Sequence, residues 1–386
     1  MELQEKTLAQ ISKNGRGYYG IGASAVPFSE ELYTYLRITD INDDGTLNMA
    51  DLKSVADENA GDYLLEPNDI VFARTGASTG RNYFFDGSDG QFVYAGFLIK
   101  FALDEKAVNP RFIKYYCMSK PYWDWISAYN TGSTRGNINA QTLASMPISL
   151  PPRDYQDKVV SILDSIESKR KRNNEINNNL SEQIQAIYRE DFDPTTHKPT
   201  GFLSDICHYS SERISISDLS VSTYFSTENM QPNKAGAVNA TSLPTISQTT
   251  KCHKGDVLIS NIRPYFKKIV YVSDECGCST DVLCFVPNDS SLSAFLFSTV
   301  YADRFFDYMV AGSKGTKMPR GDKQQIMKYP VVVPSTHALI SFSDTVKPML
   351  ETIANNRAEN IRLADIRDAL LPRLMSGELD VSELDI

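Results

Sequence analysis

Two short strings in this sequence have the composition of catalytic or nucleotide-binding motifs. Residues 76–80, GASTG, match the turn that carries a nucleophilic serine, but that motif must open a helix and the following RNYFF favours a strand. Residues 20–25, GIGASA, resemble a dinucleotide-binding fingerprint, but no buried strand precedes them and Pro27 interrupts any helix after them. Neither string predicts an active site.

The cysteines and histidines could in principle supply metal ligands. Cys252-His253, Cys276, Cys278 and Cys284 share one stretch, but their spacing fits none of the usual zinc pairs, which leave roughly two to four residues between ligands. Small thiols buried in strands are the expected alternative. The four histidines stand apart from acids and nucleophiles, and no phosphate-cradling or amino-methyltransferase string occurs. We therefore expect no catalytic site, no metal and no cofactor.

Two polar loops are better candidates, because each follows a short apolar run led by an aspartate, DIVFA at 69–73 and DVLIS at 256–260. Arginine can hold guanine through O6 and N7, asparagine can hold adenine, and hydroxyl groups suit phosphates. Loops on a rigid scaffold often carry function, although ordinary hairpin turns remain the alternative. The predicted DNA contacts here are Arg74, Thr75, Ser78, Thr79 and Arg81, and Asn261, Arg263, Tyr265 and Lys267.

Two glycine- and serine-containing loops form a second pair of candidates, with the composition of a flexible backbone clamp. The predicted contacts are Thr131, Ser133, Arg135 and Asn137, and Ser313, Lys314, Thr316, Lys317 and Arg320. A run of charged residues is usually just a solvated surface. The basic segment 312–328 lies in a chain of net charge −9, however, and this contrast favours a contact with DNA. That net charge argues against attraction of DNA to the whole surface, so contact must be local or shared with a partner.

Both pairs of loops recur because the sequence contains an internal repeat at an offset of about 180 residues, which is typical of a duplicated domain. MPISLPP at 146–152 and YPVVVPS at 329–335 align residue for residue. The length of 386 residues and 41% apolar content suit two domains, which we place at 1–152 and 194–335. No run approaches the roughly 18 apolar residues of a membrane span, and a cytoplasmic protein with reduced thiols is expected.

A long helical pattern follows each domain, at 154–190 and 337–374 within the segments 153–193 and 336–375, and a tail at 376–386 ends the chain. Its apolar residues repeat roughly every seven positions, and Pro348 suggests a kink or a late start. The second helix can cover the first only by running antiparallel, although two separate surface helices are the alternative. The apolar seam positions are Val159, Leu163, Ile166, Leu180, Val346, Ile353, Leu371 and Leu374. Polar residues occupy three further positions of the same repeat, Asn173, Asn360 and Arg367, and would fix the register of the two helices.

In this order, DIVFARTGASTG, MPISLPPRDYQDKVVSILDSI, YPVVVPS and LLPRLMSGELDV resemble the specificity subunits of type I restriction-modification systems over almost the whole chain. The resemblance implies an α+β fold, with two α/β target recognition domains separated by two long antiparallel coiled-coil helices in a pseudo-twofold arrangement. It also implies a non-catalytic subunit that reads a bipartite double-stranded DNA target. One departure is that the family's Glu-Gln after the proline run reads Asp154-Tyr155-Gln156 and Thr336-His337-Ala338.

The resemblance further implies that the helices, marked by the eight apolar seam positions, dock DNA adenine methyltransferase subunits. S-adenosylmethionine would then be bound by that partner, and restriction or translocase subunits could join the complex. At about 1.5 Å per residue, a 37-residue helix would span about 55 Å, longer than the roughly 34 Å turn of B-DNA. A coiled-coil scaffold with two protein-binding modules and a stand-alone DNA-binding regulator are the alternative hypotheses.

Overall fold

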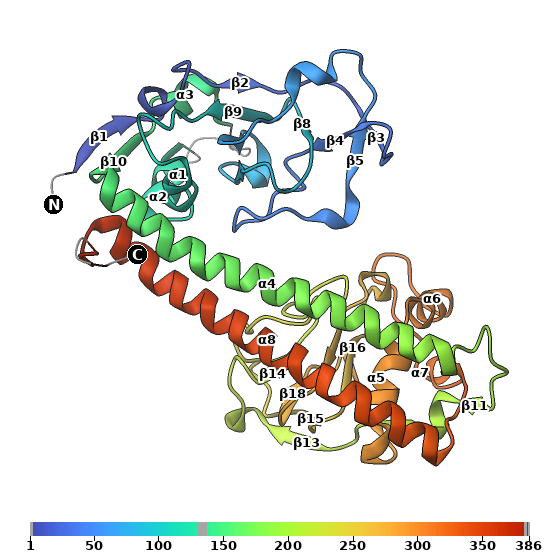
Figure 1. The fold of residues 1–386 in the computed structure, drawn as a ribbon. Coiled ribbons are helices and arrows are strands. Elements are labelled where there is room, and N and C mark those ends of the chain that lie inside the picture. Colours follow the sequence, from blue (N-terminus) through green and yellow to red (C-terminus); the bar gives the residue numbers. More distant parts are fainter. Residues whose placement is uncertain (1–2, 130–136, 382–383, 385–386) are drawn as a thin grey trace. The chain divides into compact units, whose positions relative to one another are not determined.

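A computed structural model describes residues 3–129, 137–381 and 384 of the chain, which forms two compact units (Figure 1). Unit 1 comprises Met1–Glu167 and Asp365–Ile386, and unit 2 comprises Ser168–Ala364. The division falls inside the two longest helices, so each helix contributes residues to both units.

Unit 1 contains two four-stranded sheets and one two-stranded sheet. The buried run DIVFA forms the central strand β6, because an uninterrupted apolar run suits a strand covered on both faces. The main sheet has the spatial order β2 (Tyr18–Tyr19), β9 (Leu98–Ala102), β6 (Asp69–Ala73) and β7 (Asn82–Phe85). The second sheet has the order β3 (Ala25–Pro27), β5 (Lys53–Val55), β4 (Tyr33–Leu36) and β8 (Phe92–Tyr94). The two-stranded sheet pairs β1 (Gln4–Thr7) with β10 (Pro147–Leu150). Three short helices complete the unit: α1 (Pro110–Tyr116), α2 (Lys120–Tyr129) and α3 (Ala140–Ala144).

Unit 2 repeats this set of elements. Its main sheet has the spatial order β12 (Cys207–Tyr209), β19 (Val282–Pro287), β16 (Val257–Ser260) and β17 (Ile269–Tyr271). The second sheet has the order β13 (Arg213–Ser215), β15 (Gln248–Cys252), β18 (Cys276–Cys278) and β14 (Tyr224–Phe225). The two-stranded sheet pairs β11 (Gly201–Phe202) with β20 (Pro330–Val331). Its short helices are α5 (Ser293–Tyr301), α6 (Asp303–Ala311) and α7 (Lys323–Ile326).

The internal repeat is confirmed by the strand order of the main sheets, β2-β9-β6-β7 in unit 1 and β12-β19-β16-β17 in unit 2. The repeated aspartate has the same local role in both, because Asp69 accepts a hydrogen bond from the Glu66 N–H at 2.8 Å and Asp256 accepts one from the His253 N–H at 2.7 Å. The second sheets differ at one edge. In unit 1 the earlier strand β4 is an inner strand and the later strand β8 is at the edge, whereas in unit 2 the later strand β18 is inner and the earlier strand β14 is at the edge. The copies thus share a core and diverge beside it.

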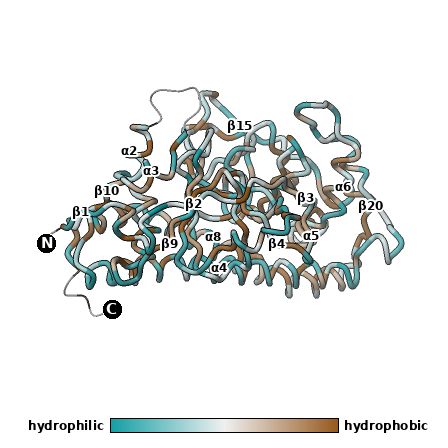
Figure 2. Tube along the Cα trace, turned by 90° about the horizontal axis from the view of Figure 1, so that it is seen from above, coloured by the Kyte–Doolittle hydropathy of each residue, from teal (hydrophilic) through white to brown (hydrophobic). Residues whose placement is uncertain are grey.

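The two predicted long helices are confirmed as α4 (Arg153–Phe192) and α8 (Thr336–Ser376). The late start suggested by Pro348 is wrong, because α8 begins twelve residues earlier and continues through the proline. Hydrophobic and hydrophilic residues alternate along both helices (Figure 2), as expected of helices with one covered face.

The helices pair antiparallel within each unit. In unit 1 the Tyr155 hydroxyl donates to the Leu374 carbonyl oxygen at 3.1 Å. In unit 2 the Asn173 amide donates to Asn360 Oδ1 at 2.9 Å, and Asn173 is only 1% exposed. A buried amide pair tolerates few alternative alignments, so it fixes the register of the helices, as the polar seam positions predicted.

The apolar seam covers the chain's own helix pair, as the predicted antiparallel pairing requires. Seven of the eight seam positions are buried and Leu180 is packed against a core, so these side chains seal the chain's own helix pair and cores. They are therefore unavailable to a partner subunit, which is a correction to the docking positions Val159, Leu163, Ile166, Leu180, Val346, Ile353, Leu371 and Leu374. Exposed apolar residues on the same helices are instead Ile176, Ile340 and Ile366.

The fingerprint-like string at residues 20–25 has a packing explanation. A methyl group on Gly20 would lie 2.2 Å from the Tyr94 carbonyl oxygen and 2.4 Å from the Ala95 carbonyl oxygen. Both are backbone atoms, so no side-chain rotation relieves the overlap. We expect Gly20→Ala to lower the free energy of unfolding by about 1–3 kcal/mol, measured by urea denaturation.

Gly22 provides the matched control, because a methyl group there meets no described atom within 4 Å. Gly22→Ala should change the free energy of unfolding by less than about 0.5 kcal/mol. Equal losses in the two variants would show that close backbone approach is not the reason for Gly20.

Candidate nucleic-acid interface

The two candidate loops of the first half meet in the structure. The β6–β7 loop (residues 74–81) includes a short 3-10 helix at Gly76–Ser78, and Thr75 forms a backbone bridge with Asn137. The Ile138 N–H also donates to the Arg74 carbonyl oxygen at 2.9 Å. Sequence positions more than 60 residues apart are thus brought together. The candidates Thr131, Ser133 and Arg135 lie outside the described residues.

Arg74 is held half-buried at this junction. Its guanidinium carbon lies 4.9 Å from the centre of the Tyr19 ring, and one terminal nitrogen lies 3.5 Å from Asn137 Oδ1. Its Nε is buried and has no hydrogen-bond partner among the described residues. Because buried donors are nearly always paired, an orphan donor at a surface loop suggests an external acceptor. Tyr19, which the sequence did not single out, positions this guanidinium.

Two candidates in the same loop already have partners within the chain. The Thr79 hydroxyl is buried and donates to the Gly76 carbonyl oxygen at 2.7 Å. Arg81 pairs with Asp43 at 2.6 Å and donates to the Ile41 carbonyl oxygen at 3.2 Å. The Thr79 hydroxyl is therefore engaged within the loop, which corrects its prediction as a DNA contact, whereas the partner of Arg81 is an exposed carboxylate that a phosphate can replace, so Arg81 stays a predicted contact. Ser78 remains partly exposed.

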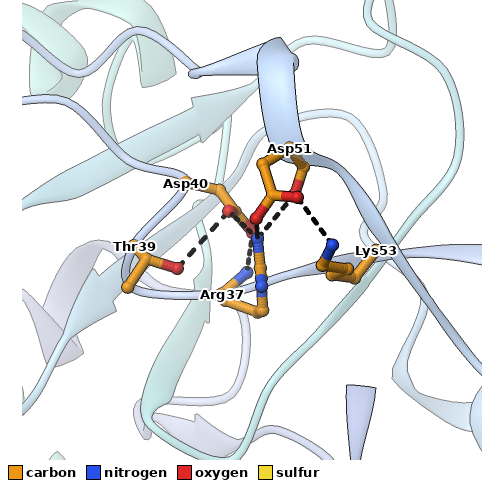
Figure 3. A network of polar contacts seen from close by, with 5 residues as sticks. All are labelled: Arg37, Thr39, Asp40, Asp51 and Lys53. Carbon is orange, nitrogen blue, oxygen red and sulfur yellow. Dashed lines mark hydrogen bonds and ion pairs between the residues drawn. The ribbon is translucent and has the colours of Figure 1, made fainter. Parts of the chain in front are cut away.

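The segment that carries Asp43 is braced by a polar network (Figure 3). Arg37 donates to Asp40 from Nε at 2.9 Å and from Nη2 at 2.6 Å, and also donates to the Asp51 carbonyl oxygen. The hydrogen bond to Asp40, which is 3% exposed, raises the pKa of Arg37. Lys53 completes the network through Asp51. The network fixes the connection between β4 and β5.

The second half repeats the convergence of loops. The β16–β17 loop (residues 261–268) lies beside residues 313–321, because the Arg263 N–H donates to the Pro319 carbonyl oxygen at 2.8 Å and Ile262 bridges to Arg320. The Gly321 N–H donates to the Asn261 carbonyl oxygen at 3.2 Å. Both halves therefore join their two sequence-predicted loops at the same end of the main sheet.

The polar interior of this second junction also has unpaired atoms. Arg263 Nε is buried without a described partner, as Arg74 Nε is in the first half. Asn261 is 7% exposed, and its Oδ1 likewise has no described donor. The same orphan arginine nitrogen therefore occurs in both halves, which makes the two junctions the candidate ligand sites of the chain.

The lysines and arginine of the second half are mostly in exposed ion pairs. Lys267 lies 2.6 Å from Asp303, Lys314 lies 2.6 Å from Asp322, and Arg320 lies 3.0 Å from Asp281. Hydrogen bonding from Lys314 holds the pKa of Asp322 below its ordinary value. Exposed pairs of this kind contribute little to stability, so a phosphate can replace the carboxylate at small cost.

The remaining candidates are distributed around this junction. Tyr265, Thr316 and Lys317 are exposed, whereas the Ser313 hydroxyl donates to the Val310 carbonyl oxygen at 2.7 Å. Lys234 was missed by the sequence reasoning. It lies 2.9 Å from Asp303, and its backbone N–H donates to the Lys267 carbonyl oxygen at 2.9 Å. Nothing in the local sequence pattern around residue 234 relates it to the distant loop.

The expectation of buried thiols is confirmed, because all six cysteines are buried and free. Cys252 lies opposite Cys276 on neighbouring strands β15 and β18. Within residues 3–129, 137–381 and 384, no group of three or more histidine, cysteine or acidic side chains is arranged to hold a metal ion. In the same part of the chain, no helix has both the length and the apolar character needed to cross a membrane.

Comparisons with known proteins agree on one family. Residues 27–184 match the type I restriction modification DNA specificity domain. The type I restriction enzyme HindI specificity subunit of Haemophilus influenzae is 20% identical over 82% of this chain and 87% of its own length. The MjaIX specificity subunit of Methanocaldococcus jannaschii is 40% identical over 76 residues, which cover 20% of this chain and 18% of that protein.

A solved structure shows the same fold. The type I restriction-modification S subunit from M. genitalium has a TM-score of 0.52 and 15% identity, with 97% of this chain and 96% of that chain covered. The shared fold is α+β, with long helices beside the sheets. The family match thus identifies a type I DNA specificity domain within residues 27–184, and the relative aligned along most of the chain is a specificity subunit, so the comparisons support a DNA-recognition subunit similar to those of type I restriction-modification systems.

Proposed function

We propose that the protein reads a bipartite double-stranded DNA target, with residues 1–152 reading one half and residues 194–335 reading the other. The observation that carries this proposal is the repeated junction of two polar loops, each with a half-buried arginine whose Nε lacks a described partner. An arginine of this kind can place its guanidinium against the O6 and N7 atoms of guanine. Two junctions on two units suit two half-sites.

The long helices would set the unread gap between the half-sites. α4 has 40 residues, which at about 1.5 Å per residue corresponds to roughly 60 Å, more than the roughly 34 Å turn of DNA. A spacer longer than one turn allows two recognition sites without contact to the bases between them. We propose the segments 153–193 and 336–375 as this spacer.

The helices would also dock DNA adenine methyltransferase subunits, which would bind S-adenosylmethionine and carry out the chemistry in the cytoplasm. Restriction and translocase subunits could join this complex. The exposed apolar side chains of Ile176, Ile340 and Ile366 support docking on the outer faces of the helices, because exposed apolar residues on an otherwise polar helix suit a protein contact.

The test is a domain exchange. Residues 1–152 are replaced by the corresponding domain of another specificity subunit, the protein is co-purified with its partner subunits, and methylated adenines are mapped across genomic DNA. We expect one half of the methylated sequence to change completely and the other half to remain the same, because each unit would contact only its own bases.

Exchange of residues 194–335 is the matched control and should change the other half alone. A change in both halves after either exchange would contradict the proposed division of the target. A scaffold that binds only proteins would instead show no salt-dependent DNA binding, with or without its partners.

A further inference from the structure

Two aromatic side chains project from the β16–β17 loop. Tyr265 and Phe266 are 48% and 38% exposed, and their ring centres lie 4.7 Å apart at an interplanar angle of 55°. The two neighbouring rings form a small exposed apolar patch, and aromatic faces can stack on nucleic-acid bases of any sequence.

The backbone presents this pair in a fixed and unfavourable conformation. Arg263 and Lys267, which flank the 3-10 helix Pro264–Phe266, have φ angles of 49° and 51°. Asn233 and Lys234 on the adjacent segment have φ angles of 55° and 63°. These four are all but one of the described residues other than glycine in the left-handed region. Such strain concentrates at binding sites, because the surrounding structure must maintain it.

Hydrogen bonds join the two strained segments. The Asn233 N–H donates to the Phe266 carbonyl oxygen at 2.8 Å, and the Lys234 N–H donates to the Lys267 carbonyl oxygen at 2.9 Å. Asp303 then accepts contacts from both Lys234 and Lys267. The aromatic pair is therefore supported along its whole turn and does not need to be ordered when a ligand arrives.

The surroundings favour a polyanion over an apolar protein surface. The junction contains seven basic side chains and five acidic ones: Lys234, Arg263, Lys267, Lys268, Lys314, Lys317 and Arg320, and Glu228, Asp281, Asp303, Asp307 and Asp322. The net positive charge would attract the phosphate backbone of DNA, and the exposed rings would stack on the faces of its bases. The orphan Asn261 Oδ1 and Arg263 Nε lie in the same junction.

The first half lacks this aromatic pair. At the corresponding turn between β6 and β7 the 3-10 helix is Gly76–Ser78, with Ala77 and Ser78 where the second half has Tyr265 and Phe266. The two halves therefore present different groups from equivalent turns. Any effect of the rings must be confined to one half of the target.

The geometry points to Tyr265 and Phe266 as a wedge that stacks on bases and opens one base step in or beside the half-site read by residues 194–335. This inference rests on the proposed function and adds a specificity-determining element to it. A wedge would make the protein sensitive to how easily that step unstacks, so selection would extend to base pairs that no side chain reads by hydrogen bonding.

The experiment measures the permanganate reactivity of thymines, which rises when a thymine is unstacked. The protein and its co-purified subunits are saturated with duplexes that carry the mapped methylation sequence and have thymines at the unread positions. We expect reactive thymines at the second half-site with the unchanged protein, and loss of that reactivity in the Tyr265→Ala/Phe266→Ala variant. Its affinity should fall by roughly tenfold or more, as expected when base stacking is removed.

Two variants serve as controls. Tyr265→Phe keeps the ring and should keep the reactivity, whereas Phe202→Ala removes a ring of unit 2 that is 53% exposed on β11 and should leave the reactivity unchanged. Thymines exposed because a partner flips its target adenine should react at both half-sites and remain reactive in the double variant.

Unchanged reactivity in the double variant, or no reactive thymine specific to the second half-site, would overturn the wedge while leaving bipartite recognition intact. The wedge is also wrong if the double variant loses only its partner subunits, because the rings would then form a protein contact. Failure of the unchanged complex to bind the mapped sequence would instead refute the proposed function itself.

Discussion

Arg263→Ala is expected to weaken binding to the mapped target by roughly 10- to 100-fold, as loss of an arginine that reads guanine bidentately costs about 1–3 kcal/mol. The guanidinium is half-buried, its backbone is held left-handed at φ 49°, and its Nε has no described partner. It has therefore already lost part of its contact with water and gains more from a base than a flexible surface arginine would. Arg263→Lys should lose nearly as much, because an ammonium group cannot replace the planar fork.

Arg213→Ala is the matched control for Arg263→Ala. It removes the same charge from unit 2, but Arg213 is exposed on β13 and its side chain donates to the Gln248 carbonyl oxygen at 3.2 Å, away from the two loops of the junction. Competition binding with duplexes altered in one half-site at a time would separate the possible roles. We expect Arg263→Ala to relax discrimination in one half-site, and Arg74→Ala to do so in the other.

A contact to phosphate alone would give a different result. Binding by Arg263→Ala would then weaken equally for all duplexes, and the salt dependence of binding would become shallower without any change in sequence preference. That outcome would remove Arg263 from base recognition.

Leu374→Ala is expected to lower the free energy of unfolding by about 2–5 kcal/mol, the usual cost of a cavity left by a buried leucine. Leu374 is 0% exposed and shares the core of unit 1 with Val159 and Leu163 of α4. The Tyr155 hydroxyl donates to its carbonyl oxygen, so the site has limited freedom to collapse around a smaller side chain. Urea denaturation of the purified chain measures the loss.

Ile366→Ala on the same helix is the matched control, because Ile366 is 48% exposed. It should leave the stability of the chain almost unchanged and, if the outer face docks the methyltransferase, reduce co-purification of that partner. If Leu374→Ala instead remained stable but lost its methyltransferase partner, the result would show that the seam positions dock the partner, as the sequence predicted.

Local patterns determined much of the fold. The apolar DIVFA run coincides with strand β6, and heptad spacing identified α4 and α8 to within two residues at their ends. These signals work because strand and helix periodicity depends on residues close together in the chain. The repeated Asp-led turns located the β6–β7 and β16–β17 loops, and glycine-serine composition located the loops that the structure brings beside them.

The roles of individual side chains required the tertiary structure. Thr79 matches the composition of a DNA contact, but the Gly76 carbonyl oxygen already engages its hydroxyl. Tyr19 and Lys234 have no suggestive neighbours in sequence, yet they support the two junctions. Composition describes what a side chain can bind, whereas its actual partners depend on segments that fold against it.

The helix seam shows the same division between sequence and structure. Apolar spacing by itself determined that α4 and α8 each have a face to cover, and polar seam residues indicated a fixed register. Only the tertiary structure decided what covers that face, because the spacing is equally suited to an internal helix pair and to a partner's helices. Burial of Val346 and Leu374 within the chain shows that the internal pair uses it.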